Sequence, residues 1–280
     1  MILKIAHLGP KGTYTEAAAQ AYGETELQGI DFELEPYANI ASTLVAVAQG
    51  DATFAIVPAE NSIEGAVTMT ADTIWHLDAK LQIQQAIVLP IRHVLISIAT
   101  NLSEITTVYS HPQALSQCQE WLQQYLPYAE RIADTSTTAA LDTLAANPQL
   151  SSISSVRAAN LYGLPILVQP INDYPDNQTK FWAIGLQPTV AGNCTSVAFS
   201  LRSNTPGGLM TALGYFANRN LNLSRIASRP SKRSLGDYLF FIDIETTVNN
   251  CPQLKSALAD LDAYAETVKN FGTYYTKVIS

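Results

Sequence analysis

The chain has 280 residues, which is longer than one ordinary domain and predicts two units with enough interior for a sizeable core. Hydrophobic residues make up 47% of the chain and charged residues only 14%, a composition that excludes a disordered chain and a coiled coil. The formal net charge of −8 argues against nucleic acid or an anionic membrane as the main partner, although a few local Lys or Arg residues can still bind a small anion.

The sequence predicts a cytoplasmic protein without a membrane segment. Residues 1–5 run directly into a strand pattern and lack the character of a signal or transit peptide. The longest apolar stretch, residues 86–99, is interrupted by proline, arginine and histidine and cannot span a bilayer. The cysteines lie far apart and fit reduced thiols in the cytoplasm: Cys118, Cys194 and Cys251.

Up to about residue 187, strand patterns alternate with helix patterns. The predicted strands are residues 2–8, 54–57, 83–89, 94–98, 105–109, 152–154, 166–170 and 181–186. The predicted helices run from a capping box at Thr13 and Glu16 to about Tyr22, over 42–49 and 70–77, from Pro112 to about Tyr125, and over 136–146 and 156–162. This alternation predicts an α/β architecture with a largely parallel sheet, arranged as two lobes.

After a loop at residues 187–193 the pattern changes. Strands are predicted over residues 195–201, 221–226, 238–244 and 268–275, and helices from Pro206 to about Arg219 and over 252–263. The order strand–helix–strand–strand–helix–strand (βαββαβ) is ferredoxin-like and predicts an α+β unit. We therefore expect one domain at residues 1–187 and a second at residues 195–280.

Five polar clusters lie at strand ends, where open α/β sheets bind their ligands. They are Gly12-Thr13, Glu60-Asn61-Ser62, Ser110-His111-Pro112-Gln113, Ser154-Ser155 and Asn177-Gln178-Thr179-Lys180. Two of them open helices, whose free N–H groups favour an anion, so together they predict a polar cleft for a small anionic molecule. Taken singly, the same residues can also be explained as turns, a helix cap or solvated loops.

No metal ion and no cofactor are expected. The four histidines lack ligand spacing such as HxxxH, the glycines at 9 and 12 match neither a P-loop nor a dinucleotide fingerprint, and no GxSxG elbow occurs. The residues alone therefore indicate a small-anion-binding α/β protein with a ferredoxin-like appendage.

Five motifs in the same order resemble those of prephenate dehydratases that carry a C-terminal ACT regulatory domain. They are LGPKGTYT at residues 8–15, VPAENSIEG at 57–65, HPQALSQC at 111–118, AANLYGL at 158–164 and NQTKF at 177–181. The resemblance runs along essentially the whole chain. No helical segment precedes Met1, so we expect the monofunctional form without a fused chorismate mutase.

The resemblance implies a two-lobed catalytic domain, similar to periplasmic binding proteins, with the active site in the cleft between the lobes. It also implies the reaction: prephenate loses carbon dioxide and water and becomes phenylpyruvate, on the route to phenylalanine. No cofactor is implied. Two alternatives remain open, namely an arogenate dehydratase and a non-catalytic binding protein that senses amino acids.

The family's catalytic threonine corresponds to Thr179, which we expect to donate a hydrogen bond to the leaving hydroxyl. The other expected catalytic residues are Glu60, Asn61, Ser62 and Gln113. The expected substrate-binding residues are Gly12, Thr13, His111, Ser155, Lys180 and Phe181. Lys180 stands where the family has arginine; it keeps the charge but loses the bidentate fork.

The segments at 206–213 and 223–230 resemble the phenylalanine-binding motifs of ACT domains, which in relatives bind the amino acid between paired domains. The expected allosteric residues are Gly207, Gly208, Leu209, Leu223, Ala227, Ser228, Arg229 and Pro230. We expect phenylalanine to act as a feedback inhibitor through this domain. Ala227 replaces the motif's glutamate, so the alternative is a domain that serves only for dimerisation. ACT pairing implies a homodimer or homotetramer.

Overall fold

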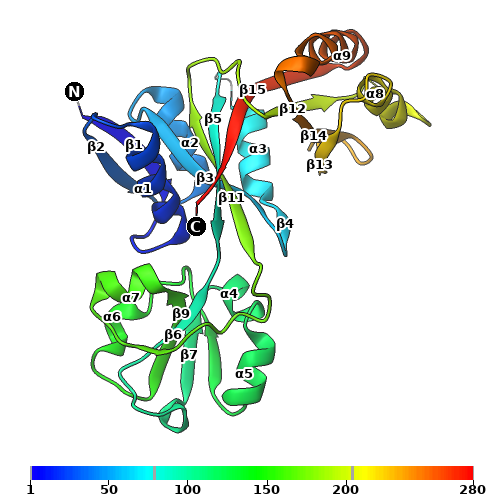
Figure 1. The fold of residues 1–280 in the computed structure, drawn as a ribbon. Coiled ribbons are helices and arrows are strands. Elements are labelled where there is room, and N and C mark those ends of the chain that lie inside the picture. The colour runs from blue at the N-terminus through cyan, green and yellow to red at the C-terminus, as the bar shows by residue number, and fades with distance from the viewer. Residues whose placement is uncertain (1, 78–79, 203–204, 280) are drawn as a thin grey trace.

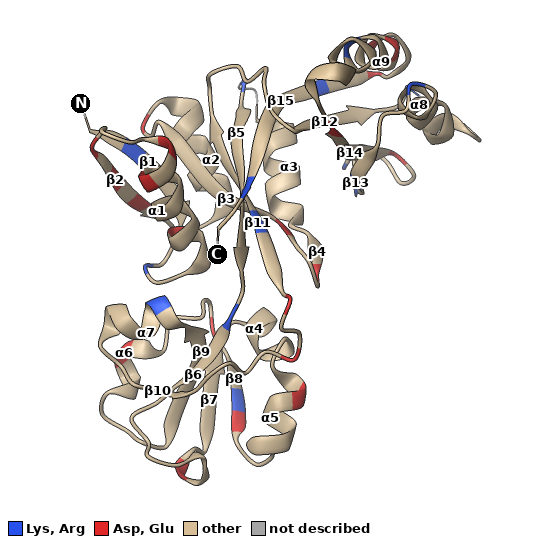
Figure 2. Cartoon of the chain, in the orientation of Figure 1, with Lys and Arg blue, Asp and Glu red and all other residues tan. Residues whose placement is uncertain are grey.

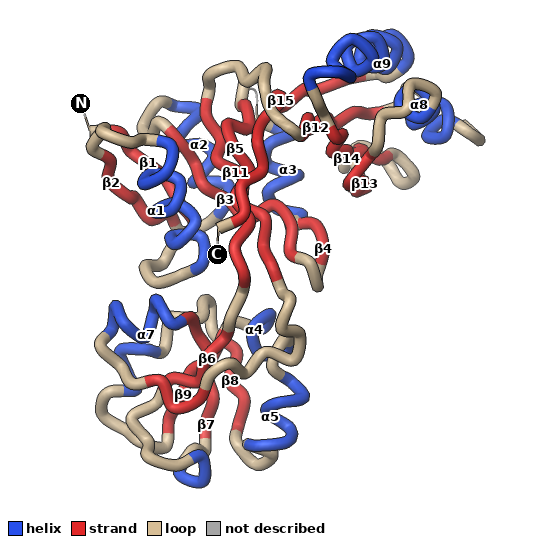
Figure 3. The backbone as a smooth tube through the Cα atoms, viewed as in Figure 1, coloured by secondary structure: helices blue, strands red, loops and turns tan. Residues whose placement is uncertain are grey.

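The computed structural model describes residues 2–77, 80–202 and 205–279 (Figure 1). The fold is mixed α/β with two sheets, one of ten strands and one of five. Two lobes lie one above the other and a C-terminal unit extends from the side of the first lobe (Figures 1 and 3). Charged residues are sparse and scattered over both lobes and the C-terminal unit (Figure 2).

The first lobe is built on the large sheet. Its strands are β1 (Leu3–Leu8), β2 (Phe32–Tyr37), β3 (Phe54–Asn61), β4 (Gly65–Ala66), β5 (Gln82–Pro90) and β11 (Gln178–Gly185). Its helices are α1 (Tyr14–Glu26), α2 (Ile40–Gln49) and α3 (Thr68–His76). Local sequence explains their limits: Thr13 accepts a hydrogen bond at the start of α1, Asn39 and Ser42 form a capping box on α2, and Gly50 ends α2 at a φ of 83°.

The second lobe is built on the small sheet, in the order β10-β6-β9-β7-β8. Its strands are β6 (His93–Ile96), β7 (Thr107–Ser110), β8 (Glu130–Ala133), β9 (Leu150–Ser155) and β10 (Ile166–Val168). Its helices are α4 (Pro112–Ser116), α5 (Gln119–Tyr125), α6 (Leu141–Leu144) and α7 (Val156–Tyr162), with a 3₁₀ turn at Leu102–Glu104. The chain passes between the lobes twice, from β5 to β6 and from β10 to β11, so the two lobes share two adjacent connections.

The C-terminal unit comprises β12 (Cys194–Ser200), α8 (Gly208–Ala217), β13 (Leu223–Pro230), β14 (Tyr238–Glu245), α9 (Cys251–Tyr264) and β15 (Thr267–Val278), with a 3₁₀ turn at Val248–Asn250. Its strands lie in the order β13-β14-β12-β15 and pair antiparallel. Strand β15 pairs with β12 from Thr267 to Tyr274 and then runs parallel to β5 from Tyr275 to Val278. One strand thus joins the C-terminal unit to the first lobe in a single continuous sheet.

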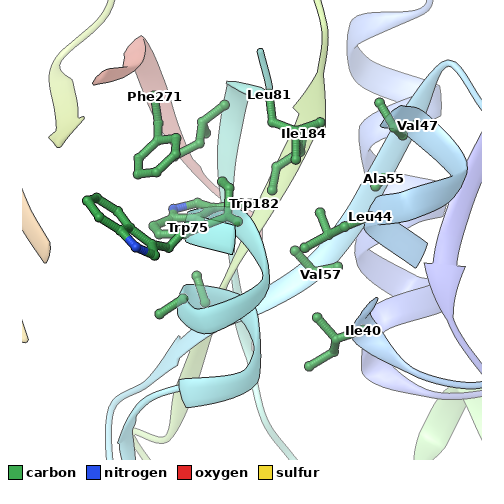
Figure 4. Packing of buried hydrophobic residues seen from close by; sticks show 14 of the residues in the cluster. Ile40, Leu44, Val47, Ala55, Val57, Trp75, Leu81, Trp182, Ile184 and Phe271 are labelled. Atoms are coloured by element: carbon green, nitrogen blue, oxygen red, sulfur yellow. The ribbon is translucent and has the colours of Figure 1, made fainter. Parts of the chain in front are cut away.

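A hydrophobic core crosses this junction. Trp75 of α3 and Trp182 of β11 belong to the same buried cluster as Phe241 of β14 and Phe271 and Tyr274 of β15. Figure 4 shows the two tryptophans beside Phe271. Because burial of each aromatic side chain removes a large apolar area from water, this shared core holds the C-terminal unit firmly against the first lobe.

Several predicted elements differ from the observed ones. The large sheet is not largely parallel, because β11 runs antiparallel to both β3 and β5. Strands β2 and β8 were not predicted, and the helix expected from Pro112 to Tyr125 is broken at Gln117 into α4 and α5. Most of the helix predicted over residues 136–146 is absent, and only α6 forms there. The backbone N of Thr138 donates to Ser136 Oγ at 3.3 Å, a local bond that competes with helix formation.

Two strand limits matter most for the site. The strand predicted to end at Pro58 continues to Asn61, and the strand predicted to begin at Phe181 begins at Gln178. Pro58 is tolerated within β3 because the register with β11 shifts there: Lys180 pairs with Glu60 but Phe181 pairs with Pro58. The extra residue forms a bulge next to the polar ends of the two strands.

Candidate active site

A cavity of about 950 Å³ is lined by residues from both lobes. The first lobe contributes the loop after β1, the segment between β2 and α2, and the adjacent ends of β3 and β11. The second lobe contributes β6, α4 and the segment after β8. The described polar residues that line it are Lys11, Thr13, Tyr14, Thr15, Tyr37, Asn61, His93, His111, Gln113, Gln117, Thr135, Ser136, Thr137, Tyr162 and Thr179.

Thr179 and Asn61 are cross-strand partners on β11 and β3, and both line the cavity. Asn61 Oδ1 accepts from the backbone N of Ile63 at 3.0 Å and of Glu64 at 3.1 Å, which fixes the orientation of the amide. Asn61 Nδ2 therefore points to Thr179 and donates to its Oγ1 at 3.0 Å. Since the threonine oxygen accepts this bond, the hydroxyl proton of Thr179 is left for another acceptor, such as a bound ligand.

A chain of amides continues from Asn61 into the second lobe. Asn61 Nδ2 donates to Asn177 Oδ1 at 2.8 Å, and Asn177 Nδ2 donates to Gln117 Oε1 at 2.8 Å. His93 Nε2 lies 3.0 Å from the same Gln117 oxygen, which can only accept, so the histidine proton is on Nε2. Each link fixes the orientation of the next, and the chain as a whole fixes the donor that faces Thr179.

His93 is a neutral group in this site. Burial lowers the pKa of His93, and the hydrogen bond to Gln117 offsets this only in part. The His93 ring packs against the Tyr14 ring in a T-shaped arrangement, and the Tyr14 hydroxyl donates to the backbone O of Arg92 at 2.7 Å. With the proton on Nε2, Nδ1 of the neutral ring can only accept, and no described residue donates to it.

Four of the predicted binding or catalytic residues line the cavity beside Asn61 and Thr179: Thr13, His111, Gln113 and Phe181. His111 also caps α4, because its Nδ1 accepts from the backbone N of Gln113 at 3.3 Å. Phe181 is 2% exposed and adds an apolar surface next to Thr179. The capping and lining interpretations of His111 are thus compatible.

Gly12 and Ser155 are not among the described residues that line the cavity. They join the two lobes instead: Ser155 Oγ donates to the backbone O of Gly12 at 3.2 Å. Gly12 N donates to Glu16 Oε2 at 2.7 Å, and the same carboxylate lies 3.5 Å from Arg157. A Cβ on Gly12, whose φ is +83°, would lie 3.2 Å from Thr138, so the close approach of the lobes requires glycine here.

Glu60 and Lys180 also lie outside the described lining of the cavity. Successive side chains of a strand point to opposite faces, so these neighbours of Asn61 and Thr179 project from the other side of the sheet. There Lys180 Nζ lies 3.1 Å from Glu60 Oε2 and 3.5 Å from Asp243 Oδ2 of β14. The side chains of Glu60 and Lys180 therefore face the C-terminal unit and point away from the cavity.

Ser62 does not line the cavity in the described residues, and it binds the first residue of β11 instead. It exchanges backbone and side-chain bonds with Gln178: Ser62 N donates to Gln178 O, and Gln178 N donates to Ser62 Oγ, both at 2.9 Å. The Ser62 hydroxyl also lies 3.4 Å from Asn177 Oδ1. Ser62 therefore holds the start of β11, from which Thr179 projects.

Sequence reasoning missed several lining residues. Lys11 lies within the first matching motif and is the only lysine or arginine among the described lining residues. Gln117 lies one helical turn after Gln113 in the third motif, a spacing that could have indicated a shared face. No local pattern marks His93 or Ser136, because only the packing of the lobes brings them to the cavity.

Comparison with known proteins gives a consistent result. A sequence profile of the prephenate dehydratase family matches residues 5–189. The chain belongs to this family. It is 34% identical over 279 residues to a prephenate dehydratase of Lactococcus lactis subsp. cremoris, covering 97% of each chain. It is 37% identical to a bifunctional chorismate mutase/prephenate dehydratase of Pseudomonas aeruginosa, covering 99% of this chain and 74% of that one.

A solved prephenate dehydratase of Arthrobacter aurescens in complex with L-Phe superposes with a TM-score of 0.86 at 33% identity. The match covers 98% of this chain and 90% of that one. The prephenate dehydratase fold therefore extends over nearly the whole chain, including the C-terminal unit.

This member of the prephenate dehydratase family has a second cavity of about 750 Å³ at the C-terminal unit. Three of the predicted allosteric residues line it, namely Gly207, Gly208 and Leu209. The other five lie on β13 and are not among its described lining residues: Leu223, Ala227, Ser228, Arg229 and Pro230. Arg229 binds Asp72 of α3 through two hydrogen bonds, of 2.9 and 3.1 Å.

Within the described ranges, no group of three or more His, Cys, Asp and Glu residues is placed to hold a metal ion. No helix in the described part of the chain is long and apolar enough to cross a membrane.

Proposed function

We propose that the cavity between the lobes binds prephenate and that Thr179, with Asn61, promotes its conversion to phenylpyruvate. Prephenate dehydration on the route to phenylalanine is the activity of the family to which the chain belongs. The observation that carries the assignment is the hydrogen bond from Asn61 to Thr179 Oγ1 at 3.0 Å, which leaves the threonine proton free for a substrate hydroxyl.

The reaction breaks two bonds that join substituents to the substrate ring, and the ring itself stays intact. The carbon–carboxylate bond breaks and its electron pair enters the ring, while the carbon–hydroxyl bond breaks on the opposite side and the hydroxyl leaves as water. The leaving hydroxyl must gain a proton. Thr179 donates a hydrogen bond to it and stabilises the charge that develops there, and the net proton comes from solvent because a threonine hydroxyl is a weak acid.

Other lining residues fit the remaining requirements of the reaction. Lys11, in the loop after β1, supplies a positive charge at the cavity for a carboxylate of the substrate. His93 is neutral, so it can accept a hydrogen bond but does not add a second charge. Phe181, Pro58 and Ile91 give the cavity apolar walls, against which a departing carboxylate is poorly solvated and loses carbon dioxide more readily.

The test is phenylpyruvate formation from prephenate by the purified full chain at neutral pH without added metal. Turnover on prephenate that exceeds turnover on arogenate supports the proposal. A preference for arogenate assigns the same site to arogenate dehydration, and binding without turnover on either compound supports an amino-acid sensor. The Thr179→Val variant is the control, because it keeps the shape of the side chain and removes the hydroxyl.

We further propose that residues 1–187 form the catalytic domain and residues 195–280 an ACT regulatory domain. The antiparallel order β13-β14-β12-β15 with two helices supports a ferredoxin-like unit. The relative from Arthrobacter aurescens was solved in complex with L-Phe, which supports phenylalanine as the regulator. Pairing of two such units would give a homodimer or homotetramer, and the free cysteines fit the cytoplasm.

The second cavity offers the groups that phenylalanine needs. Its described lining carries both signs of charge, with Arg202, Lys232 and Arg233 beside Asp237 and Glu266, and Trp75 adds apolar surface. Arg233 and Glu266 are paired with each other at 2.8 Å, so a bound ammonium and carboxylate would have to share or open this pair. Calorimetric titration with L-phenylalanine, with turnover measured in parallel, tests this assignment. Binding that lowers turnover supports feedback inhibition, whereas absence of binding at millimolar concentration leaves the C-terminal unit a dimerisation module.

A further inference from the structure

A cluster of four charged side chains lies on the face of the large sheet opposite the cavity. Lys180 of β11 and Glu60 of β3 come from the first lobe, and Arg225 of β13 and Asp243 of β14 come from the C-terminal unit. Arg225 Nη1 lies 3.3 Å from Asp243 Oδ1, and Arg225 Nε lies 3.8 Å from Glu60 Oε2. The two positive and two negative charges balance, so the cluster is neutral as a whole.

The C-terminal half of the cluster is deeply buried and well anchored. The side chains of Asp243 and Arg225 are only 1% and 5% exposed. Asp243 Oδ1 accepts from Ser196 Oγ at 2.6 Å, and the guanidinium of Arg225 lies 5.4 Å from the ring centre of Trp182. These contacts give Lys180 a rigid partner in the C-terminal unit.

One oxygen of the buried aspartate depends on Lys180. Asp243 Oδ2 accepts no hydrogen bond from the described residues, and Lys180 Nζ, 3.5 Å away, is the cation that faces it. Asp243 keeps Arg225 at Oδ1, but without Lys180 its buried Oδ2 faces no described cation, which is unfavourable. We therefore expect loss of the lysine charge to displace either the aspartate or the adjacent strand β11.

Strand β11, which contains Lys180, also carries Thr179, the group proposed to act on the substrate. Lys180 follows Thr179 in β11, and Glu60 precedes Asn61 in β3. Thr179 pairs with Asn61 across the two strands, and Lys180 pairs with Glu60. The register of β11 with β3 shifts immediately beyond Lys180, so this ladder is irregular there and the contact between Lys180 and Glu60 adds to what holds the two strands together.

We propose that Lys180, bound between Glu60 and Asp243, is a positioning residue through which the C-terminal unit sets the geometry of Thr179 and Asn61 in the cavity. This inference rests on the proposed function of Thr179. It differs from a substrate-binding role for Lys180, since the lysine acts through β11 and does not touch the ligand.

The experiment compares kcat and KM for prephenate in the full chain and its variants. We expect Lys180→Met and Asp243→Asn each to lower kcat about 10- to 100-fold with little change in KM, because misplacement of a reacting group costs turnover at this scale. Lys180→Arg should restore most of kcat. The double variant should lose less than the product of the two single losses, since both remove the same contact.

Lys4→Met is the matched control, because it removes a lysine charge from an exposed pair with Glu35 elsewhere in the same sheet. Its kcat should remain that of the wild type. A raised KM with unchanged kcat in Lys180→Met would mean that the lysine binds substrate and would overturn the inference. Wild-type kcat in both Lys180→Met and Asp243→Asn, or an equal loss in Lys4→Met, would overturn it as well.

Amide hydrogen exchange gives a readout that does not depend on turnover. Faster exchange in β3 and β11 of Lys180→Met, but not of Lys4→Met, supports the positioning role, and unchanged exchange contradicts it. If the wild-type chain does not convert prephenate, the proposed function fails while this measurement still decides whether Lys180 holds the two strands.

Discussion

Replacement of Thr179 by valine tests the central contact of the proposed mechanism. Valine has nearly the shape of threonine, so the change removes the hydroxyl and leaves the volume of the side chain almost unchanged. If the hydroxyl stabilises the leaving group in the transition state, its loss should lower kcat by about 10²- to 10³-fold, or roughly 2.7–4 kcal/mol, as for other preorganised donors.

The same substitution should cost little stability. Asn61 Nδ2 loses its bond to Thr179 but keeps Asn177 Oδ1 at 2.8 Å and has Gln178 O at 3.2 Å as an alternative acceptor. No buried donor is left unpaired, so the free energy of unfolding should fall by about 1 kcal/mol or less. A large loss of activity with a small loss of stability separates catalysis from folding.

The assay is phenylpyruvate formation under saturating prephenate, with denaturant unfolding of the same preparations. Thr179→Ser keeps a hydroxyl and serves as the control, retaining most of the activity. Near-wild-type kcat in Thr179→Val would refute the reasoning, because the proposed donor would then be dispensable. Equal losses in the serine and valine variants would also refute it, since packing rather than the hydroxyl would be responsible.

Three further predictions concern stability. Burial lowers the pKa of His93, one of two buried histidines with this shift, so the stability it contributes is present above about pH 6.5 and declines as the pH falls. Denaturant unfolding at pH 7 and pH 5 should show a smaller difference in His93→Gln than in the wild type. Gly12→Ala should destabilise the chain more than Gly50→Ala in the same unfolding assay: both have a φ of +83°, but only at Gly12 would the new Cβ meet the other lobe. The hydrogen bond from Arg229 lowers the pKa of Asp72, so Asp72→Asn should cost under about 1 kcal/mol of unfolding free energy at pH 7 and less as the pH falls through that lowered pKa. An equal cost at pH 7 and pH 3, or equal effects of the two glycine variants, would contradict these expectations.

The sequence by itself determined the family and much of the chain's local structure. The five ordered motifs indicated a prephenate dehydratase, and the sequence profile of that family confirms it. Helix ends were predictable where a single residue begins or ends the helix. Thr13 caps α1, and Gly50 and Gly163 end α2 and α7 in left-handed conformations. Such signals act over three or four residues, so the linear sequence contains them.

The ends of the strands were harder to predict. They determine which face of the large sheet each site residue points to. An end at Pro58 left Glu60 and Asn61 in a loop where both could reach a ligand. The observed β3 continues to Asn61, and strand alternation then sends Asn61 into the cavity and Glu60 to the opposite face. The same alternation separates Thr179 from Lys180 on β11.

Contacts between distant segments were decided only by the tertiary structure. The amide chain joins Asn61, Asn177, Gln117 and His93 across both lobes, and no local spacing relates these positions. Likewise, β15 pairs with both the C-terminal unit and the first lobe, which makes one sheet of two predicted domains. Sequence patterns report local conformation and burial, whereas the partners of a polar side chain depend on how the folded segments meet.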